Sequence, residues 1–382
     1  MAEIRLESLA HSYTAHPASD ADYAIRRMNH VWEDGGAFAL LGPSGCGKST
    51  MLNIISGLLT PSEGAVKFNG QTVNGLEPQE RNIAQVFQFP VIYDTMTVFD
   101  NLAFPLRNMK TPAAKIRSKV QEIAEILELT PVLDKKARNL NADEKQKVSM
   151  GRGLVRDDVS AILFDEPLTV IDPHLKWKLR RKLKQIHEQF NITMVYVTHD
   201  QLEAATFADK IAVMYDGAIV QFGTPRELFE QPNHTFVGYF IGSPGMNLLP
   251  VKRAPDSADI TFKGLPIALT ANQQHALSHT QSENIKVGIR PEFVHLRDTQ
   301  KEASFAVTVT HTEDLGTYKI VTVMLDDTSI KIRLAEGSPV PARHGWINFP
   351  SRWLKLYIDE YLVGEDSENG DEDSQGGSGN AA

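Results

Sequence analysis

One segment constrains the fold of this 382-residue chain more than any other, and it reads Gly42-Pro43-Ser44-Gly45-Cys46-Gly47-Lys48-Ser49. It matches the pattern G-x-x-x-x-G-K-[ST], in which glycines let backbone N–H groups converge on phosphate oxygens. The apolar run Ala37–Leu41 precedes this loop and a helical run, Thr50–Leu58, follows it. We therefore expect a strand, a phosphate-binding loop and a helix whose positive dipole end faces the phosphates.

The loop predicts a nucleotide site that uses ATP and Mg²⁺. Lys48 is expected to reach the β- and γ-phosphates, and Ser49 to ligate Mg²⁺. Thr50 opens the helix beside them, and Tyr13, about 30 residues before the loop, is placed to stack on adenine. Cys46 has two interpretations, a reactive thiol that could block nucleotide binding or a small residue that fills the loop.

Further apolar runs alternate with helical patterns up to about residue 240, which predicts an α/β domain with a mainly parallel sheet. The predicted strands are Ile83–Phe87, Ala161–Phe164, Met194–Val197 and Ile211–Met214. Two apolar helix faces are also evident, one formed by Ile116, Val120, Ile123 and Leu127 and the other by Leu175, Leu179, Leu183 and Ile186.

Polar side chains follow three of these strands directly. Asp165 and Glu166 end one strand, His199 follows another, and Gln88 follows a third. The carboxyl ends of parallel strands face the ligand crevice of such a domain. We expect Asp165 to hold Mg²⁺ through water, Glu166 to polarise the attacking water and His199 to contact the γ-phosphate. Gln88 could coordinate Mg²⁺ or bind the water.

The pattern of apolar residues changes near Pro244. Short alternating runs such as Ser304–Thr310 and Ile320–Leu325 replace the helical patterns, which predicts a small all-β barrel or sandwich. The expected domains are therefore 1–240, 241–363 and an acidic tail, 364–382. The tail carries six acidic residues and no basic one, and we expect it to be disordered.

Composition excludes some classes of protein. The formal charge is −9, so a whole-chain basic field for nucleic acid is absent and no nucleic-acid partner is expected. The chain has one cysteine, which fits a reducing compartment. No apolar run approaches the roughly 18 to 20 residues that span a bilayer. A cytosolic protein is expected, with any membrane association made through a partner.

These motifs, in this order, resemble the ATPase subunits of ABC transporters from about residue 3 to residue 240. The resemblance is carried by residues 42–49, Gln88, Leu163–Pro167, Ile171-Asp172 and Val197–Asp200. It implies that Lys48 and Ser49 contact phosphate and Mg²⁺, that Gln88 and Asp165 hold Mg²⁺, that Glu166 is the catalytic base and that His199 contacts the γ-phosphate. It also implies that Asp172 lies in a loop facing a second ATPase domain.

The remainder resembles the sugar and polyol importer branch of that family. Phe236–Pro250 is similar to its linker, and Val287–Glu292 to a motif of its OB-type regulatory and dimerising β-barrel. The resemblance implies two transmembrane permease subunits, an external solute-binding protein and a peripheral place on the cytoplasmic face of the membrane. The segment Leu140–Glu144, together with Gly151–Arg156, also resembles ATPases of glycerol importers, which use two distinct ATPase chains.

The family's signature, Leu-Ser-Gly-Gly-Gln, is altered in this chain. The corresponding window reads Leu140-Asn141-Ala142-Asp143-Glu144. In the family, two ATPase domains dimerise head to tail, and the signature of one binds the ATP on the phosphate loop of the other. Asp143 would place a carboxylate near a polyanion, and Ala142 and Asp143 restrict the close backbone approach that glycine permits.

We therefore expect a heterodimer with one hydrolytic and one weakened site. A variant homodimer stays open, because asparagine can also cap a helix. Two other classes remain: a soluble ABC ATPase acting on nucleic acid or ribosomes, and a mainly regulatory subunit. The acidic charge and the lack of a long coiled-coil insertion weigh against the first. The presence of Glu166 and His199 weighs against the second.

Overall fold

The computed structural model describes residues 2–156, 158–253, 259–301 and 303–363. The chain forms two compact units, Met1–Gln231 and Pro232–Ala382. This division falls before helix α8 (Thr235–Phe240), whereas the sequence analysis places it after residue 240. The predicted disordered tail lies outside the described residues.

A six-stranded sheet in the order β10-β9-β3-β8-β7-β6 forms the centre of the N-terminal unit. All neighbours run parallel except β10 and β9. The strands are β3 (Ala37–Leu41), β6 (Ile83–Val86), β7 (Ala161–Asp165), β8 (Thr193–Thr198), β9 (Lys210–Tyr215) and β10 (Ala218–Gly223). The five apolar runs therefore form strands as predicted, with ends that differ by at most one residue.

A second sheet of this unit was not predicted from the sequence. It is antiparallel, in the order β2-β1-β4-β5. Its strands are β1 (Ile4–Ser12), β2 (Tyr23–Trp32), β4 (Glu63–Phe68) and β5 (Gln71–Thr72). In β2 only Ile25 and Trp32 are fully buried, so this strand lacks the near-continuous apolar run that marks the parallel strands.

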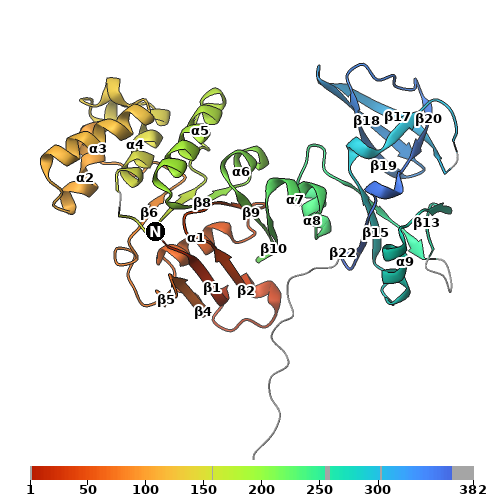
Figure 1. Cartoon of the computed structure of the whole chain (residues 1–382), viewed down its shortest axis with the longest axis horizontal. Coiled ribbons are helices and arrows are strands. Elements are labelled where there is room, and N and C mark those ends of the chain that lie inside the picture. Colours follow the sequence, from red (N-terminus) through yellow and green to blue (C-terminus); the bar gives the residue numbers. More distant parts are fainter. Residues whose placement is uncertain (1, 157, 254–258, 302, 364–382) are drawn as a thin grey trace, which may run out of the picture. The chain divides into compact units, whose positions relative to one another are not determined.

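The helices of this unit include the two predicted amphipathic ones. They are α1 (Lys48–Ser56), α2 (Val98–Asn108), α3 (Ala113–Ile126), α4 (Ala142–Leu154), α5 (Pro173–Phe190), α6 (Gln201–Phe207) and α7 (Pro225–Glu230). The predicted apolar faces of α3 and α5 are buried, although Leu175 of α5 is only partly so. Helices α2, α3 and α4 form a group of their own (Figure 1).

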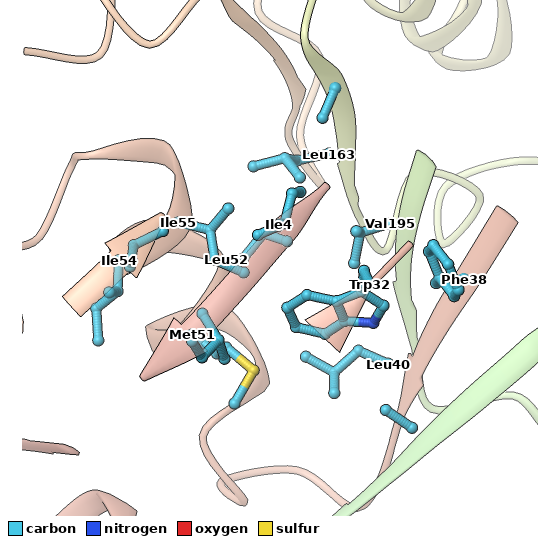
Figure 2. Close-up of a cluster of buried hydrophobic side chains, with 14 of the residues drawn as sticks. Ile4, Trp32, Phe38, Leu40, Met51, Leu52, Ile54, Ile55, Leu163 and Val195 are labelled. Carbon is cyan, nitrogen blue, oxygen red and sulfur yellow. The ribbon is translucent and has the colours of Figure 1, made fainter. Parts of the chain in front are cut away.

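The core of the N-terminal unit joins both sheets to helix α1. Figure 2 shows Ile4 and Trp32 of the antiparallel sheet beside Leu40, Leu163 and Val195 of the parallel sheet. Met51, Leu52, Ile54 and Ile55 of α1 complete the cluster and are fully buried. Helix α1 is therefore held by packing, which fixes the position of the loop that precedes it.

The C-terminal unit is built mainly from antiparallel strands around one core. Its sheets have the orders β11-β15-β21-β22, β12-β13-β14 and β16-β20-β17-β18-β19. The strands are β11 (Asn247–Pro250), β12 (Lys252–Arg253), β13 (Ile260–Phe262), β14 (Leu265–Ile267), β15 (Ile285–Ile289), β16 (His295–Arg297), β17 (Phe305–Asp314), β18 (Tyr318–Leu325), β19 (Thr328–Ala335), β20 (His344–Asn348), β21 (Lys355–Ile358) and β22 (Tyr361–Val363).

Besides α8, this unit contains helix α9 (Ala271–Ser278), which the sequence analysis did not predict. Thr270 and Gln273 form a capping box at its start, and Gln273 also donates to the carbonyl of Leu354 at 3.0 Å. Two short strands that the sequence did predict are longer than expected, since β17 extends to Asp314 and β18 begins at Tyr318. Short 3-10 helices cover Asp20–Asp22, Thr130–Val132, Ala137–Asn139, Pro291–Phe293 and Ser351–Trp353.

Candidate nucleotide site

The phosphate-binding loop lies between β3 and α1, as expected. Gly45 and Gly47 have φ values of +82° and +103°, in a region that favours glycine. A Cβ atom on Gly47 would lie 2.4 Å from the backbone oxygen of Ala24. The loop can therefore take this path only with glycine at residue 47, which caps α1.

Two carbonyl oxygens of the loop hold the Lys48 ammonium. Its Nζ donates to Gly42 O at 2.9 Å and to Pro43 O at 2.8 Å, and the residue is only 6% exposed. The Sγ atom of Cys46 lies 3.9 Å from the same nitrogen. Burial raises the pKa of the Cys46 thiol, which favours its interpretation as a loop-filling residue over that of a reactive thiol.

Two oxygen ligands suited to Mg²⁺ meet beside the loop. The Ser49 hydroxyl donates to Oδ1 of Asp165 at 3.3 Å, and Asp165 is the last residue of β7. Burial raises the pKa of Asp165, and the charge of Glu166 adds to this effect. A divalent cation bound here would relieve both costs, so the donor set fits Mg²⁺, which prefers hard oxygen ligands.

Glu166 has a strained backbone, with φ at +45°. A non-glycine residue in this region costs about 1 kcal/mol or more and persists only where its surroundings fix it. Here the Glu166 N–H donates to Val197 O at 3.0 Å, and the Thr169 hydroxyl donates to Glu166 O at 3.1 Å. The Thr169 hydroxyl also lies 3.4 Å from Oε2 of Glu166, a contact that the sequence did not indicate.

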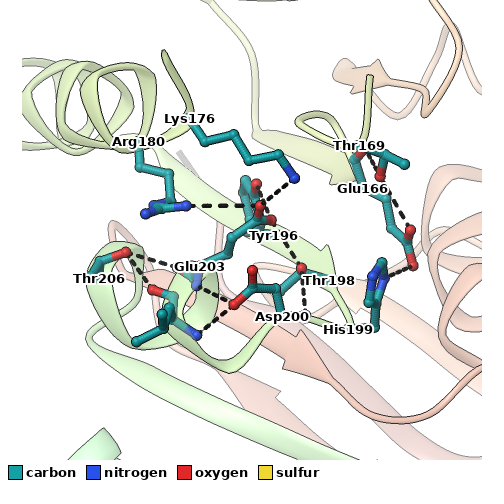
Figure 3. A network of polar contacts seen from close by, with 11 residues as sticks. Glu166, Thr169, Lys176, Arg180, Tyr196, Thr198, His199, Asp200, Glu203 and Thr206 are labelled. Carbon is teal, nitrogen blue, oxygen red and sulfur yellow. Dashed lines mark hydrogen bonds and ion pairs between the residues drawn. The ribbon is translucent and has the colours of Figure 1, made fainter. Parts of the chain in front are cut away.

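His199 and Glu166 touch each other. Nδ1 of His199 lies 3.1 Å from Oε1 of Glu166, as Figure 3 shows. The two residues follow neighbouring parallel strands, β8 and β7. The side chain of His199 is 57% exposed, whereas that of Glu166 is 20% exposed. The contact therefore places an exposed imidazole against a more buried carboxylate at the ends of the strands.

Tyr13 and Gln88 lie before and after the phosphate loop along the chain. Gln88 comes two residues after β6, the strand next to β7, and is partly exposed. Its segment is tied to α4, since Gln146 donates to Phe87 O at 3.1 Å. Tyr13 is 69% exposed, and its hydroxyl lies 3.1 Å from that of Thr50, directly beside the phosphate loop.

The carboxyl ends of β3, β8, β7 and β6 therefore bring most of the predicted site residues to one edge of the sheet. They carry, in this order, the loop at 42–49, His199, Asp165 with Glu166, and Gln88. Asp172 lies further along, as the N-cap of α5, where its carboxylate accepts from the N–H of His174 at 2.8 Å.

The altered signature forms the start of α4. Asn141 is the N-cap: its Oδ1 accepts from the Glu144 N–H at 2.8 Å, and Oε2 of Glu144 accepts from the Asn141 N–H at 3.0 Å. Asp143 forms an ion pair with Lys147, with Oδ2 and Nζ 2.9 Å apart. This pair was not predicted from the sequence, and it offsets part of the negative charge of Asp143.

The first turn of α4 thus carries its own anions. Asp143 and Glu144 occupy the end of the helix where the dipole attracts negative charge. The Glu144 N–H, which could otherwise bind an anion, donates to the side chain of Asn141. Among the hydrogen bonds and ion pairs of the described residues, none joins Asn141–Glu144 to the loop at 42–49. The two regions are therefore separate chemical sites on this chain.

Three family models match the chain. The model described as ABC transporter matches residues 25–169. The MalK OB fold domain matches residues 242–294, and the TOBE domain matches residues 287–344. The OB-type assignment made from Val287–Glu292 is thereby confirmed, and the loop, the strand ends and the matched model define a phosphate-loop ATPase.

Two relatives are similar over most of their length. The trehalose import ATP-binding protein SugC of Mycobacterium tuberculosis (strain CDC 1551 / Oshkosh) is 41% identical over 327 residues, 84% of this chain and 81% of SugC. The sn-glycerol-3-phosphate import ATP-binding protein UgpC of Psychromonas ingrahamii (strain DSM 17664 / CCUG 51855 / 37) is 40% identical over 316 residues, 83% of this chain and 80% of UgpC.

A solved structure is also similar. The dimeric ATP-binding cassette MJ0796, in a post-hydrolysis state bound to ADP and Pi, has a TM-score of 0.52 and 28% identity, covering 58% of this chain and 98% of that chain. The chain belongs to the ATP-binding proteins of ABC transporters. It is an ATPase of this family, whose members bind ATP with Mg²⁺, and it carries the MalK-type OB and TOBE domains after the ATPase domain.

No helix among the described residues is both long enough and apolar enough to cross a bilayer.

Proposed function

We propose that this chain energises an ABC importer of a small polar solute, such as a sugar, glycerol, a glycerol phosphate or another polyol. The relatives named for trehalose and for sn-glycerol-3-phosphate import support the importer class and this range of solutes. The MalK-type OB domain supports the same branch. Solute choice would depend on permease and solute-binding subunits that this chain does not contain.

In this proposal the edge of the sheet binds the nucleotide. Tyr13 stacks on adenine, residues 42–50 surround the phosphates and Lys48 neutralises their charge. Ser49, Asp165 and Gln88 hold Mg²⁺, which supplies charge neutralisation on the β- and γ-phosphates when it is bound. The 3.3 Å contact between Ser49 and Asp165 supports this assignment, because it already brings together two oxygen atoms of the kind that Mg²⁺ prefers as ligands.

The observation that carries the catalytic proposal is the 3.1 Å contact between His199 and Glu166. Glu166 would accept the proton of a water that attacks the γ-phosphate, and its fixed, strained backbone would hold the carboxylate in place. His199 would orient Glu166 and donate to the γ-phosphate. Both residues come from strand ends next to the phosphate loop, so they need no rearrangement of the fold to act together.

The start of α4 supports an asymmetric pair of ATPase subunits. Asn141–Glu144 would face the ATP bound by the partner, with Asp172 in the same dimer interface. The internal capping box and the carboxylates of Asp143 and Glu144 oppose the binding of another chain's γ-phosphate. A partner with an intact signature would complete one hydrolytic site with this chain's Lys48, Glu166 and His199, and the other site would be weak.

Two transmembrane permease subunits and an external solute-binding protein would complete the assembly, at the cytoplasmic face of the membrane. Tagged protein purified from membranes is expected to bring down two integral-membrane chains. Recovery of ribosomes or nucleic acid in their place would overturn the importer proposal. ATP hydrolysis by the purified complex, stimulated by one solute from a panel of sugars and polyols with the binding protein present, would identify the solute.

A further inference from the structure

Helix α6 carries a buried carboxylate, Glu203, close to the proposed catalytic pair. Glu203 is 3% exposed, whereas its apolar neighbour Leu202 is 71% exposed. Burying a carboxylate costs several kcal/mol unless charges and hydrogen bonds compensate it. The sequence of α6 would sooner bury the leucine, so the orientation of this helix indicates that Glu203 has specific partners inside the protein.

Figure 3 shows these partners, which come from two other elements. Oε2 of Glu203 accepts from the Tyr196 and Thr198 hydroxyls of β8, each at 3.0 Å. Oε1 lies 3.3 Å from Lys176 Nζ and 3.8 Å from Arg180 Nη1, both on α5. Burial raises the pKa of Tyr196 far above its ordinary value, so its phenol remains a donor. The carboxylate therefore joins α5, β8 and α6.

One of these contacts fixes the backbone around His199. The Thr198 hydroxyl donates to Glu203 and also accepts from the Asp200 N–H at 3.0 Å. Thr198 and Asp200 precede and follow His199 directly, so one hydroxyl holds the chain on both sides of it. The anchored backbone holds the Cα atom of His199, from which the half-exposed imidazole reaches Oε1 of Glu166 at 3.1 Å.

A second contact leads to the loop at Asp172. Lys176 lies in the first turn of α5, and its N–H donates to Asp172 O at 3.1 Å. Its ammonium contacts the same Glu203 carboxylate that holds Thr198. The carboxylate thus connects the start of α5, next to Asp172, with the end of β8, next to His199.

We propose that Glu203 is a positioning residue that sets His199 against Glu166 and connects His199 to the loop at Asp172. This inference rests on the proposed function of His199 and Glu166. It assigns no contact with nucleotide to Glu203, which acts only through Thr198 and Lys176. Turnover should therefore depend on the link between Glu203 and Thr198 more than on the affinity for ATP.

The direct variant, Glu203→Gln, leaves Lys176 and Arg180 without a counter-charge in a buried place and can fail to fold for that reason alone. Thr198→Val is the sharper variant, because it removes the hydroxyl and keeps the shape. Thr198→Ser restores the hydroxyl. Tyr196→Phe is the matched control, since it removes the other 3.0 Å hydrogen bond to the same Oε2 and leaves the Thr198 link intact.

These variants are measured in the complete transporter in lipid vesicles, as kcat and KM for ATP. Thr198→Val should lower kcat about tenfold or more, with a change in KM of less than about threefold. Thr198→Ser and Tyr196→Phe should retain kcat within about threefold. A loss of kcat in Tyr196→Phe as large as that in Thr198→Val would overturn the proposal, because the network would then act through general stability.

A double-mutant cycle separates this inference from the proposed function. If Thr198 acts through His199, adding Thr198→Val to His199→Ala should cause no further loss of kcat. Losses that multiply would overturn the positioning role and leave the roles of His199 and Glu166 standing. Full turnover of His199→Ala alone would instead overturn the proposed function of His199, and the positioning role with it.

Discussion

The strand-end site and the start of α4 differ in how well their side chains are arranged to bind a phosphate. At the strand ends, Lys48 is buried in a loop shaped by glycines, and His199 contacts Glu166 at the edge of the sheet where nucleotide is proposed to bind. At the start of α4, the side chains satisfy one another: Asn141 and Glu144 cap each other, and Asp143 pairs with Lys147. One region is arranged for an external anion, and the other has anions of its own.

Under the proposed function, this difference means that the two halves of an ABC nucleotide site have diverged on one chain. The residues that a subunit uses for its own ATP are constrained by the strands and by α1, which pack in the core. At the start of α4, the capping box of Asn141 with Glu144 and the ion pair of Asp143 with Lys147 hold the side chains in place. In the proposed asymmetric pair, a change at the start of α4 would weaken the partner's site and leave Glu166 and His199 of this chain unaltered.

The largest effect is expected from Glu166→Gln in the strand-end site. Turnover of the complete transporter should fall at least about 100-fold, because the amide cannot accept the proton of the attacking water. ATP should still bind, since Lys48 and the loop are unchanged. The measurement is steady-state hydrolysis together with retention of radiolabelled ATP by the complex.

Glu230→Gln is a suitable control, because it changes the same chemical group in an exposed ion pair with Arg226 on α7. It should leave turnover unchanged, as such surface pairs contribute little. If the Glu166→Gln variant hydrolyses ATP at the rate of the control, Glu166 is not the catalytic base. The catalytic role proposed for the strand-end site is then wrong.

The second effect concerns the start of α4. Asn141→Ser, Ala142→Gly and Asp143→Gly together should tighten nucleotide binding at the partner's site about tenfold, or about 1.4 kcal/mol. Glycine would allow close backbone approach, and removing the Asp143 carboxylate leaves Lys147 free to attract phosphate. Equilibrium binding of a fluorescent ATP analogue to the complete transporter measures this change.

Asp143→Asn tests the charge alone and should give part of the increase in nucleotide affinity at the partner's site. Asp134→Asn, at an exposed position before α4, should leave that affinity unchanged. Unchanged affinity in both the triple variant and Asp143→Asn would contradict the charge argument. The altered signature would then be a working variant of the usual one.

A smaller effect is expected at Cys46 inside the loop. Burial raises the pKa of its thiol, so the reactive thiolate is scarcer at pH 7 than in a free thiol. Alkylation by N-ethylmaleimide should be slower than for glutathione at pH 7 and should speed up as the pH rises. Mass spectrometry of the modified protein follows this rate, and equal rates at pH 7 would show that the loop does not shield the thiol.

The smallest effect is a change in stability at Asp165. Because burial and Glu166 raise its pKa in the folded state, stability is lost as the pH rises through the window between its ordinary and its raised pKa. Without nucleotide, Asp165→Asn should therefore melt higher than the unchanged protein at pH 7. The melting temperature should rise by about 2–4 °C for each kcal/mol added to the free energy of unfolding, and this rise should vanish at a pH below the ordinary pKa of aspartate.

Asp209→Asn provides a control of opposite sign. Burial works to raise the pKa of Asp209, but hydrogen bonds from Lys184 and from the Ala37 N–H outweigh it and lower the pKa. Its stabilising contribution is present above the ordinary pKa, so this variant should melt lower at pH 7. A lower melting temperature for Asp165→Asn as well would show that its carboxylate is not strained in the free site.

Much of the N-terminal fold follows from local patterns. The apolar runs become the parallel strands, and the helical faces of α3 and α5 become buried, because continuous burial leaves a plain mark on a sequence. Strand β2 leaves no such mark, since most of its side chains are only partly buried. Its place depends on pairing with β1, which one stretch of sequence does not reveal.

The site shows the same division. Lys48, Asp165, Glu166 and His199 are predictable because each is adjacent to a recognisable strand or loop. Glu203 is not, because its burial depends on partners from α5 and β8 that are distant in the chain. The pair between Asp143 and Lys147 has helical i, i+4 spacing, and that signal could have been read from the sequence.

In the proposed function, this chain works opposite a different ATPase subunit. Native mass spectrometry of the transporter purified from its own membranes, through a tag on this chain, counts the subunits directly. We expect one copy of this chain, one copy of a second ATPase whose signature contains the usual serine and glycines, and two permease chains. Two copies of this chain with no second ATPase would contradict it.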